Sequence, residues 1–523
     1  MQLLKKSAKI ILLVALIAII AFFAGRIWNT HQMTPLKPWH TFVPQEMSIT
    51  AMDKGDWTAY LAAETKAFDS VRSEVTDKLG PEAQTAFNRY YANSDVYPGN
   101  YTQDWNRSYS LQPVGKPVGS VVLLHGLTDS PYSLRHIARR YAADGFAVVA
   151  IRLPGHGTVP AGLSHVEWEE WMAATRLAVR EAKRLSGAEA PLHIVGFSNG
   201  GALAVKYALD AIENKQLARP DRLILLSPMI GITRFARLAG FAGLPAVLPA
   251  FAKAAWLSIV PEFNPFKYNS FPVNGGRQSH RLTQALQEQI VRMANNATLK
   301  DIAPILTFQS VMDFTVSTRA IITSLYTYLP ANGSELVLFD VNRSVRFGPL
   351  LNRNSLTMLD RIMPSLPQPY RLSIIGNNPA DPDMTTVTTF NAGQTAPSVT
   401  PLRIRYPAEI FSMSHVSIPF PLSDSLYGLE PDTSKEDFGV QLGTLAPRGE
   451  RGVMVVNVDF LSRIASNPFF PFILERIDAG IRDPRPAAAA TPVPAVYGKV
   501  KPIDDAEREA FLKELFAEPE ATP

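Results

Sequence analysis

Pro191-Leu-His-Ile-Val195 followed by Gly196-Phe-Ser-Asn-Gly200 is the stretch that decides the fold. The first five residues form an apolar run typical of a buried strand, and the sequence after Gly200 favours a helix up to Asp210. A Gly-x-Ser-x-Gly turn between a strand and a helix predicts a nucleophile elbow, in which Gly196 and Gly200 let the two backbones pass closely. Ser198 is therefore the candidate nucleophile, although so short a motif also arises by chance and needs support from the rest of the chain.

The composition is that of an ordinary globular protein. The chain has 523 residues, of which 46% are hydrophobic and 19% charged, enough for one large core with insertions or for two to three domains. A net charge of +4 is too small for this length to indicate nucleic-acid binding. The absence of cysteine excludes disulfides, a thiolate nucleophile and cysteine-ligated metal. The sequence offers neither a metal-ligand cluster nor a nucleotide-binding glycine loop, so we expect no cofactor and no metal.

The N-terminus predicts a membrane anchor. Three lysines precede an apolar run from Ile10 to Gly25, which Arg26 follows. A helix of this length spans about 24 Å against a hydrocarbon core of about 30 Å, and snorkelling of the flanking basic side chains makes up the difference. We expect residues 1–28 to be an uncleaved signal anchor, with the body exported to the periplasmic or extracytoplasmic side. A cleaved signal peptide that releases a secreted protein is the alternative.

Strand-like and helix-like segments alternate from about residue 118 onwards and predict a doubly wound, mostly parallel α/β sheet. Two insertions interrupt the alternation: an apolar, partly helical one that we expect to form a lid, and a second one before the candidate catalytic histidine. We divide the chain into residues 1–28 (anchor), 29–117 (linker and N-terminal helical extension), 118–228 (first part of the core), 229–300 (lid), 301–343 (second part of the core), 344–408 (second insertion), 409–483 (histidine loop and C-terminal helical part) and 484–523 (flexible tail with a short helix).

A serine hydroxyl needs a base to take its proton, usually a histidine that a buried carboxylate orients. Only His280 and His415 follow Ser198 in the chain. His280 lies in a polar stretch of the predicted lid, whereas His415 follows a strand-like run, where a catalytic loop is expected. We therefore predict that His415 is the base.

Asp313 is the candidate acid. It follows the predicted strand at 304–308, and a carboxylate at the carboxyl end of that strand stands on the same sheet edge as the elbow serine. Asp301 precedes the strand and lies at the wrong edge. Asp340, at the end of the next predicted strand, is the reserve candidate.

The tetrahedral intermediate of acyl transfer needs backbone N–H donors around its oxyanion, typically two. We assign these donors to Asn199, directly after the nucleophile, and to Leu127, in the loop after the first strong strand. Gly126 allows the Leu127 amide to face the site, and His125 is expected to fix this loop by hydrogen bonding.

Together these motifs resemble the α/β-hydrolase superfamily, and within it the carboxylesterase, monoacylglycerol lipase and serine-aminopeptidase-like group. The resemblance covers residues 118–330 and the histidine loop locally. It rests on His125-Gly126, the loop Arg152-Leu-Pro-Gly-His-Gly157, the elbow, the acid loop Gln309–Asp313 and the histidine loop Ser414–Val416.

The resemblance implies a triad of Ser198, Asp313 and His415, an oxyanion hole of Leu127 and Asn199, and a structural role for His156. Asp313 and His415 are 102 residues apart (415 − 313), against a few tens in the group. Residues 344–408 must therefore fold aside for the triad to close.

We expect a membrane-tethered serine hydrolase that forms an acyl-enzyme on Ser198 and cleaves a hydrophobic or lipid-like carboxylic ester. An aminopeptidase-like amide hydrolase would need lid carboxylates for a free amine, and the lid contains only Glu262 and Glu288. Acyl transfer to another hydroxyl is also open, because the acyl-enzyme does not dictate its acceptor. A non-catalytic binding scaffold is the remaining alternative, and the presence of all three triad residues argues against it.

Overall fold

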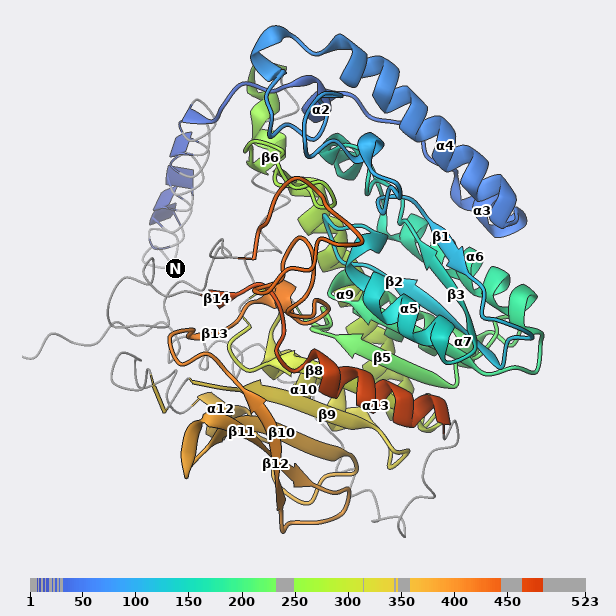
Figure 1. Ribbon diagram of the computed structural model, residues 1–523, viewed down its shortest axis with the longest axis vertical. Helices are drawn as coiled ribbons and strands as arrows, with labels where there is room; N and C mark the ends of the chain where they lie inside the picture. Colours follow the sequence, from blue (N-terminus) through green and yellow to red (C-terminus); the bar gives the residue numbers. More distant parts are fainter. Residues whose placement is uncertain are drawn as a thin grey trace, which may run out of the picture.

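A ten-stranded sheet runs through the protein, in the order β1-β3-β2-β4-β5-β8-β9-β10-β11-β12 (Figure 1). The computed structural model describes residues 32–231, 249–313, 315–342, 345–346, 358–443 and 463–482, together with isolated positions between residues 7 and 28. The strands of the sheet are β1 (Tyr109–Leu111), β2 (Gly119–Leu124), β3 (Phe146–Ile151), β4 (Leu192–Phe197), β5 (Arg222–Leu226), β8 (Ile305–Ser310), β9 (Glu335–Asp340), β10 (Arg371–Asn378), β11 (Asp381–Phe390) and β12 (Ser398–Arg405).

The strands from β3 to β10 in this order pair in parallel, and β1, β11 and β12 are antiparallel to their neighbours. Parallel strands need crossover connections, and the apolar runs of the central strands are buried on both faces, as such connections require. The prediction of a mostly parallel α/β sheet is confirmed.

Helices cover both faces of this sheet. Within β2, Val122 and Leu124 belong to one apolar core and Val121 and Leu123 to the other, because successive side chains point to opposite faces. Residues of α6 (Trp168–Ser186), α7 (Asn199–Glu213), α9 (Val273–Asn295) and α10 (Thr318–Ser324) fill the first core. Residues of α5 (Arg135–Ala143) and α13 (Phe470–Arg482) fill the second.

The second predicted insertion extends the sheet. After α12 (Met358–Ile362), β10 pairs in parallel with β9, and β11 and β12 add antiparallel strands beyond it. Figure 1 shows these strands at the edge of the sheet farthest from the N-terminal helix α4 (Trp57–Glu74). The chain then returns to the body through β13 (Ser412–Met413), which pairs with β14 (Arg463–Ile464). Residues 371–405 therefore extend the sheet beyond β9, on the side away from β4, the strand that leads into the elbow.

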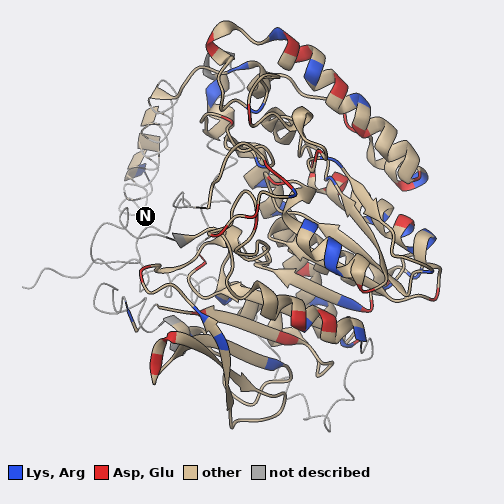
Figure 2. Ribbon diagram, in the orientation of Figure 1, with Lys and Arg blue, Asp and Glu red and all other residues tan. Residues whose placement is uncertain are grey.

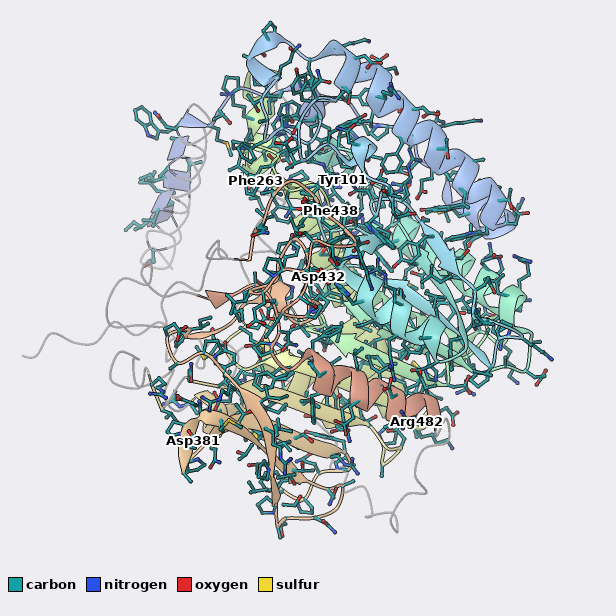
Figure 3. All side chains as sticks on the ribbon, in the orientation of Figure 1. Tyr101, Phe263, Asp381, Asp432, Phe438 and Arg482 are labelled. Atoms are coloured by element: carbon teal, nitrogen blue, oxygen red, sulfur yellow. The ribbon has the colours of Figure 1, made fainter. Side chains whose placement is uncertain are left out.

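The N-terminal extension packs on the body through α2 (Pro38–Thr41), α3 (Ile49–Lys54) and α4 (Trp57–Glu74). Asp56 caps α4 by accepting a hydrogen bond from the Ala59 amide at 2.8 Å, and Tyr60 is buried in the core shared with the sheet. The exposed side of α4 carries both charge signs, as a solvated helix face does (Figure 2). Tyr101 stacks edge-on against Phe438, with ring centroids 5.1 Å apart, so the extension also contacts the C-terminal part (Figure 3).

Several predicted segments lie wholly or partly outside the described residues. Of the lid, the structure describes η7 (Pro249–Ala255), β6 (Trp256–Ser258), β7 (Phe271–Pro272) and α9, but not residues 232–248. The tail at 484–523 and most of the anchor at 1–28 also lie outside. Among the described residues, no helix is both long and apolar enough to cross a bilayer. The lid, the anchor and the tail stay predictions.

Candidate active site

Ser198 occupies a strained turn between β4 and α7. Its φ of 53° and ψ of −115° lie in a region that residues with a side chain rarely adopt. Backbone hydrogen bonds hold it there: its amide donates to Leu226 O at 3.0 Å, and its carbonyl accepts from Gly201 and Met229 at 2.9 Å each. The turn places the hydroxyl at the carboxyl edge of the parallel sheet.

The glycines on either side of this turn have no room for a side chain. A Cβ at Gly196 would lie 2.4 Å from Gly200 O, and a Cβ at Gly200 would lie 2.0 Å from Leu124 O. Both contacts are far inside van der Waals distance, so the strand and the helix meet this closely only because both positions are glycine.

Three polar side chains meet at the elbow in a hydrogen-bonded row. His415 Nε2 lies 3.0 Å from Ser198 Oγ, and His415 Nδ1 lies 2.7 Å from Asp313 Oδ2. A carboxylate only accepts, so Nδ1 carries the proton and Nε2 is left to accept from the serine hydroxyl. This is the arrangement in which a histidine can take the serine proton.

The carboxylate of Asp313 is held in place from its other side. Its Oδ1 accepts hydrogen bonds from the Thr315 amide at 2.9 Å and the Val316 amide at 3.1 Å, and its side chain is fully buried. The His415 ring stacks on Phe197, with centroids 5.4 Å apart. The acid and the base are therefore fixed before any substrate arrives.

The hydrogen-bonded row contains the preferred candidates Asp313 and His415, and the alternatives from the sequence, Asp340, His280 and Asp301, lie elsewhere. Asp340 ends β9, one strand beyond β8, while the carboxylate bonded to His415 comes from Asp313. His280 lies within α9, and the nitrogen bonded to Ser198 comes from His415. Asp301 lies in η8 (Leu299–Asp301), before β8.

Asn342 closes the long detour between Asp313 and His415. It follows β9 in a left-handed conformation with a φ of 58°, and its side-chain amide donates to Pro407 O and to Ile410 O, both at 2.7 Å. These two bonds tie the end of β9 to the segment just before the histidine loop. Ser414 continues the anchoring, since its amide and hydroxyl donate to Ile464 O at 3.2 and 3.1 Å. Nothing in the sequence pattern singled out Asn342, because the two carbonyls that its side chain binds are 65 and 68 residues away.

The loop assigned to the oxyanion hole lies against the elbow. A Cβ at Gly126 would lie 3.2 Å from Ser198 Cβ. Asn199 is fully buried and is the first residue of α7, where the backbone amides have no acceptor within the helix. Both predicted donors, Leu127 and Asn199, thus belong to segments that border Ser198, and their role stays a prediction.

His125 ties this loop to the next one. The Leu153 amide donates to His125 Nε2 at 3.0 Å, so the proton sits on Nδ1, which donates to Gly126 O at 2.9 Å. Burial, with the neighbouring His156, holds the pKa of His125 well below its usual value. His125 is therefore a neutral bridge between two loops.

His156 and Asp129 complete the surroundings of the loop. His156 donates from Nδ1 to Pro154 O at 3.0 Å, and burial lowers its pKa to about 4. Asp129, which the sequence did not single out, accepts from the Gly126 amide at 3.3 Å and from Ser133 Oγ at 2.7 Å. The sequence signal that could have pointed to Asp129 is its position three residues after Gly126, in the pattern His-Gly-x-x-Asp.

Comparison with known proteins finds similarity over part of the chain. Residues 115–342 match the family model described as serine aminopeptidase, S33. Over 92 residues the chain is 34% identical to a thermostable monoacylglycerol lipase of a Bacillus species, a match that covers 18% of this chain and 35% of that protein. Over 119 residues it is 30% identical to an uncharacterised abhydrolase domain-containing protein of Dictyostelium discoideum, covering 23% of this chain and 12% of that one. The chain thus spans only about a third or less of these relatives.

Solved structures with similarity include two monoacylglycerol lipases. The enzyme of Paleococcus ferrophilus aligns with a TM-score of 0.31 and 19% identity, over 42% of this chain and 83% of that one. A soluble variant of the monoglyceride lipase of Saccharomyces cerevisiae aligns with a TM-score of 0.34 and 17% identity, over 44% and 81% respectively.

Proposed function

Because the chain carries an α/β-hydrolase domain of the carboxylesterase and monoacylglycerol-lipase-like group, we propose that it is a serine hydrolase that cleaves hydrophobic carboxylic esters. The observation that carries the proposal is the hydrogen-bonded row Asp313–His415–Ser198, with separations of 2.7 and 3.0 Å. A row in this order activates a serine hydroxyl for attack on a carbonyl carbon.

The reaction proceeds in two halves. Ser198 Oγ attacks the ester carbonyl while its proton passes to His415 Nε2, and Asp313 stabilises the imidazolium that forms. The amides of Leu127 and Asn199 donate to the oxyanion. The attack gives a tetrahedral intermediate. Its collapse breaks the ester bond and leaves the acyl group on Ser198, while His415 gives its proton to the departing alcohol. Water, deprotonated by His415, then attacks the acyl-enzyme and releases the carboxylic acid and free Ser198.

A lipid-like ester is the substrate class that we favour. Supporting it are the apolar composition of residues 238–257 and the identity to a protein named as a monoacylglycerol lipase. The lid over an acyl pocket would come from the part of residues 229–300 that precedes α9, because α9 itself packs in the first apolar core.

An aminopeptidase-like activity ranks lower, although the matched family model bears that description. It needs a free carboxylate to receive the substrate amine. Glu262 is 1% exposed and already accepts from the amides of Asn269 and Ser270, at 2.9 and 2.7 Å, and burial raises its pKa. Glu288 lies on the exposed side of α9. The two acidic residues of the predicted lid are thus poorly suited to that task.

Membrane attachment through residues 1–28, with the body exported, is part of the proposal. At the described positions of this segment, the apolar side chains of Ile10, Leu13, Ile17 and Trp28 are more than half exposed, which fits a lipid-facing helix. Carbonate washing of membranes tests the point: the full chain should stay in the pellet. Release of the protein into the supernatant at its full mass would argue against the anchor, and release after loss of the first 25 to 30 residues (roughly the length of a signal peptide) would favour the secreted form.

The activity itself is tested on the detergent-solubilised full chain. We expect hydrolysis of p-nitrophenyl butyrate and octanoate by the wild type, and none above background by a folded Ser198→Ala variant. Labelling of the wild type by a fluorophosphonate separates a hydrolase from a non-catalytic scaffold. Equal turnover in the wild type and in Ser198→Ala would refute Ser198 as the nucleophile. Transfer of the acyl group from the acyl-enzyme to added glycerol would favour an acyltransferase.

A further inference from the structure

The segment that joins the predicted anchor to the body reaches the loop behind the candidate oxyanion hole. We call residues 33–48 the N-terminal strap. We propose that Glu46 of this strap is a positioning residue for the reaction, acting through Arg152 on the loop that carries Gly126 and Leu127. This inference rests on the proposed hydrolase function, and it makes the strap part of the catalytic unit.

Glu46 and Arg152 form a two-pronged ion pair. Arg152 Nη1 donates to Glu46 Oε1 and Nη2 to Oε2, both at 2.7 Å, and the Gly155 amide also donates to Oε1 at 2.9 Å. The Arg152 side chain is 1% exposed and that of Glu46 is 14% exposed. A planar guanidinium held at both nitrogens has one orientation only, so Glu46 fixes where the Arg152 loop sits.

A second carboxylate from the N-terminal extension completes the grip. Glu64, on α4, accepts from Arg152 Nε at 3.0 Å and from the amide and hydroxyl of Ser108. Ser108 Oγ in turn accepts from the Arg152 amide at 2.8 Å. Backbone and side chain of Arg152 are therefore both held by residues that precede the α/β core in the chain.

From Arg152 the contacts lead directly to the nucleophile. Arg152 Nη1 also donates to His156 O at 2.9 Å, and the next residue, Leu153, donates its amide to His125 Nε2 at 3.0 Å. His125 holds Gly126 O at 2.9 Å, and Gly126 lies against Ser198. Up to Gly126, each step is a buried hydrogen bond or a peptide unit, and the last step to Ser198 is a close packing contact. A shift of the Arg152 loop must therefore move the candidate oxyanion donor at Leu127.

The charges in this cluster depend on one another. Although burial raises the pKa of Glu46, the charge and hydrogen bonds of Arg152 and the Gly155 amide outweigh it and hold that pKa below its usual range. Arg152 remains charged in its buried position because of Glu46 and Glu64. Neutralising Glu46 thus removes one of the two carboxylates that hold the buried guanidinium and weakens the constraint on its orientation.

The strap is also bound to the predicted lid. Lys253 Nζ donates to Met33 O at 2.7 Å, Thr34 Oγ1 donates to Ile259 O at 3.4 Å, and His40 Nε2 lies 3.0 Å from Ser270 Oγ. The same short segment therefore contacts the predicted lid at one end and the Arg152 loop at the other.

The test compares kcat and KM of full-length variants for p-nitrophenyl butyrate. Glu46→Gln should lower kcat by roughly 10-fold or more and change KM by no more than about twofold, because the oxyanion donor acts in the transition state. Glu46→Asp, which keeps the charge but shortens the reach, should give an intermediate kcat. The matched control is Asp53→Asn: Asp53 lies in the same extension and makes an equally bidentate pair, with Arg176 at 2.8 Å twice, but on α6 away from the loop.

Circular dichroism at the assay temperature must show that each variant is folded. A folded Glu46→Gln variant with wild-type kcat, or an equal loss in Asp53→Asn, would overturn the proposal while leaving the hydrolase function intact. If Glu46→Gln does not fold, Glu46→Asp decides, and a wild-type kcat in that variant counts against the proposal. Inactivity of the wild type itself, equal to Ser198→Ala, would refute the proposed function instead.

Discussion

At the scale of single residues, the activity depends on which carboxylate orients His415. Asp313→Asn should lower kcat by roughly 10³- to 10⁴-fold, because an amide at this position favours the wrong histidine tautomer. Asp340→Asn, at the end of the neighbouring strand, should leave kcat within about twofold, because the carboxylate that bonds to His415 comes from Asp313. Steady-state kinetics on the two folded variants check this. A larger loss in Asp340→Asn than in Asp313→Asn would mean that the reserve candidate is the true acid.

The sequence could identify the residues of the row but not their supports. Ser198 follows from a local motif, and Asp313 and His415 follow from strand ends and chain order. Asn342 and Glu46 have no such signature, because each acts on backbone or side chains that are distant in sequence. Their importance becomes visible only when the chain is folded.

At the scale of elements, the long detour between Asp313 and His415 is closed by one side chain. Asn342→Ala removes both hydrogen bonds that tie β9 to the start of the histidine loop, at Pro407 and Ile410. One buried and one part-buried carbonyl lose their donor, so the free energy of unfolding should fall by about 2–4 kcal/mol. Urea denaturation measures this. Gln394→Ala, in the exposed turn between β11 and β12, is the control and should change it by less than about 0.5 kcal/mol; equal effects would contradict the role of Asn342.

The sequence predicted strand-like pieces between residues 344 and 408 without predicting where they pair. Alternation of apolar and polar residues identifies a strand, but its neighbour is set by contacts that are not local. The structure adds β10, β11 and β12 to the main sheet beyond β9, so what reads as an insertion in the sequence is the continuation of the core.

At the scale of the whole molecule, buried neutral histidines make the stability depend on pH. Burial lowers the pKa of His193 to about 3, those of His40 and His156 to about 4. The unfolded chain therefore binds protons from about pH 6.5 downward, its ordinary histidine pKa, while the folded chain does not. The stability that each contributes is complete above that pH and is lost as the pH falls, by about 1.4 kcal/mol per unit.

A variant isolates this effect from other titrating groups. His193 lies in β4 beside Tyr141, 3.0 Å from its hydroxyl, where glutamine can replace the hydrogen bond. Between pH 6 and 5, His193→Gln should lose less stability than the wild type, by about 1.4 kcal/mol per pH unit. Urea denaturation at the two pH values gives the slopes. Identical slopes would show that His193 is protonated alike in both states.

Mass spectrometry tests most directly whether Ser198, activated by His415 and Asp313, is the nucleophile. The full chain is treated with a fluorophosphonate and digested, and the modified peptide is sequenced. We predict a single adduct on Ser198 in the wild type, much slower labelling in His415→Ala and none in a folded Ser198→Ala variant. An adduct on another residue, or an unmodified wild type alongside ester hydrolysis, would contradict the account.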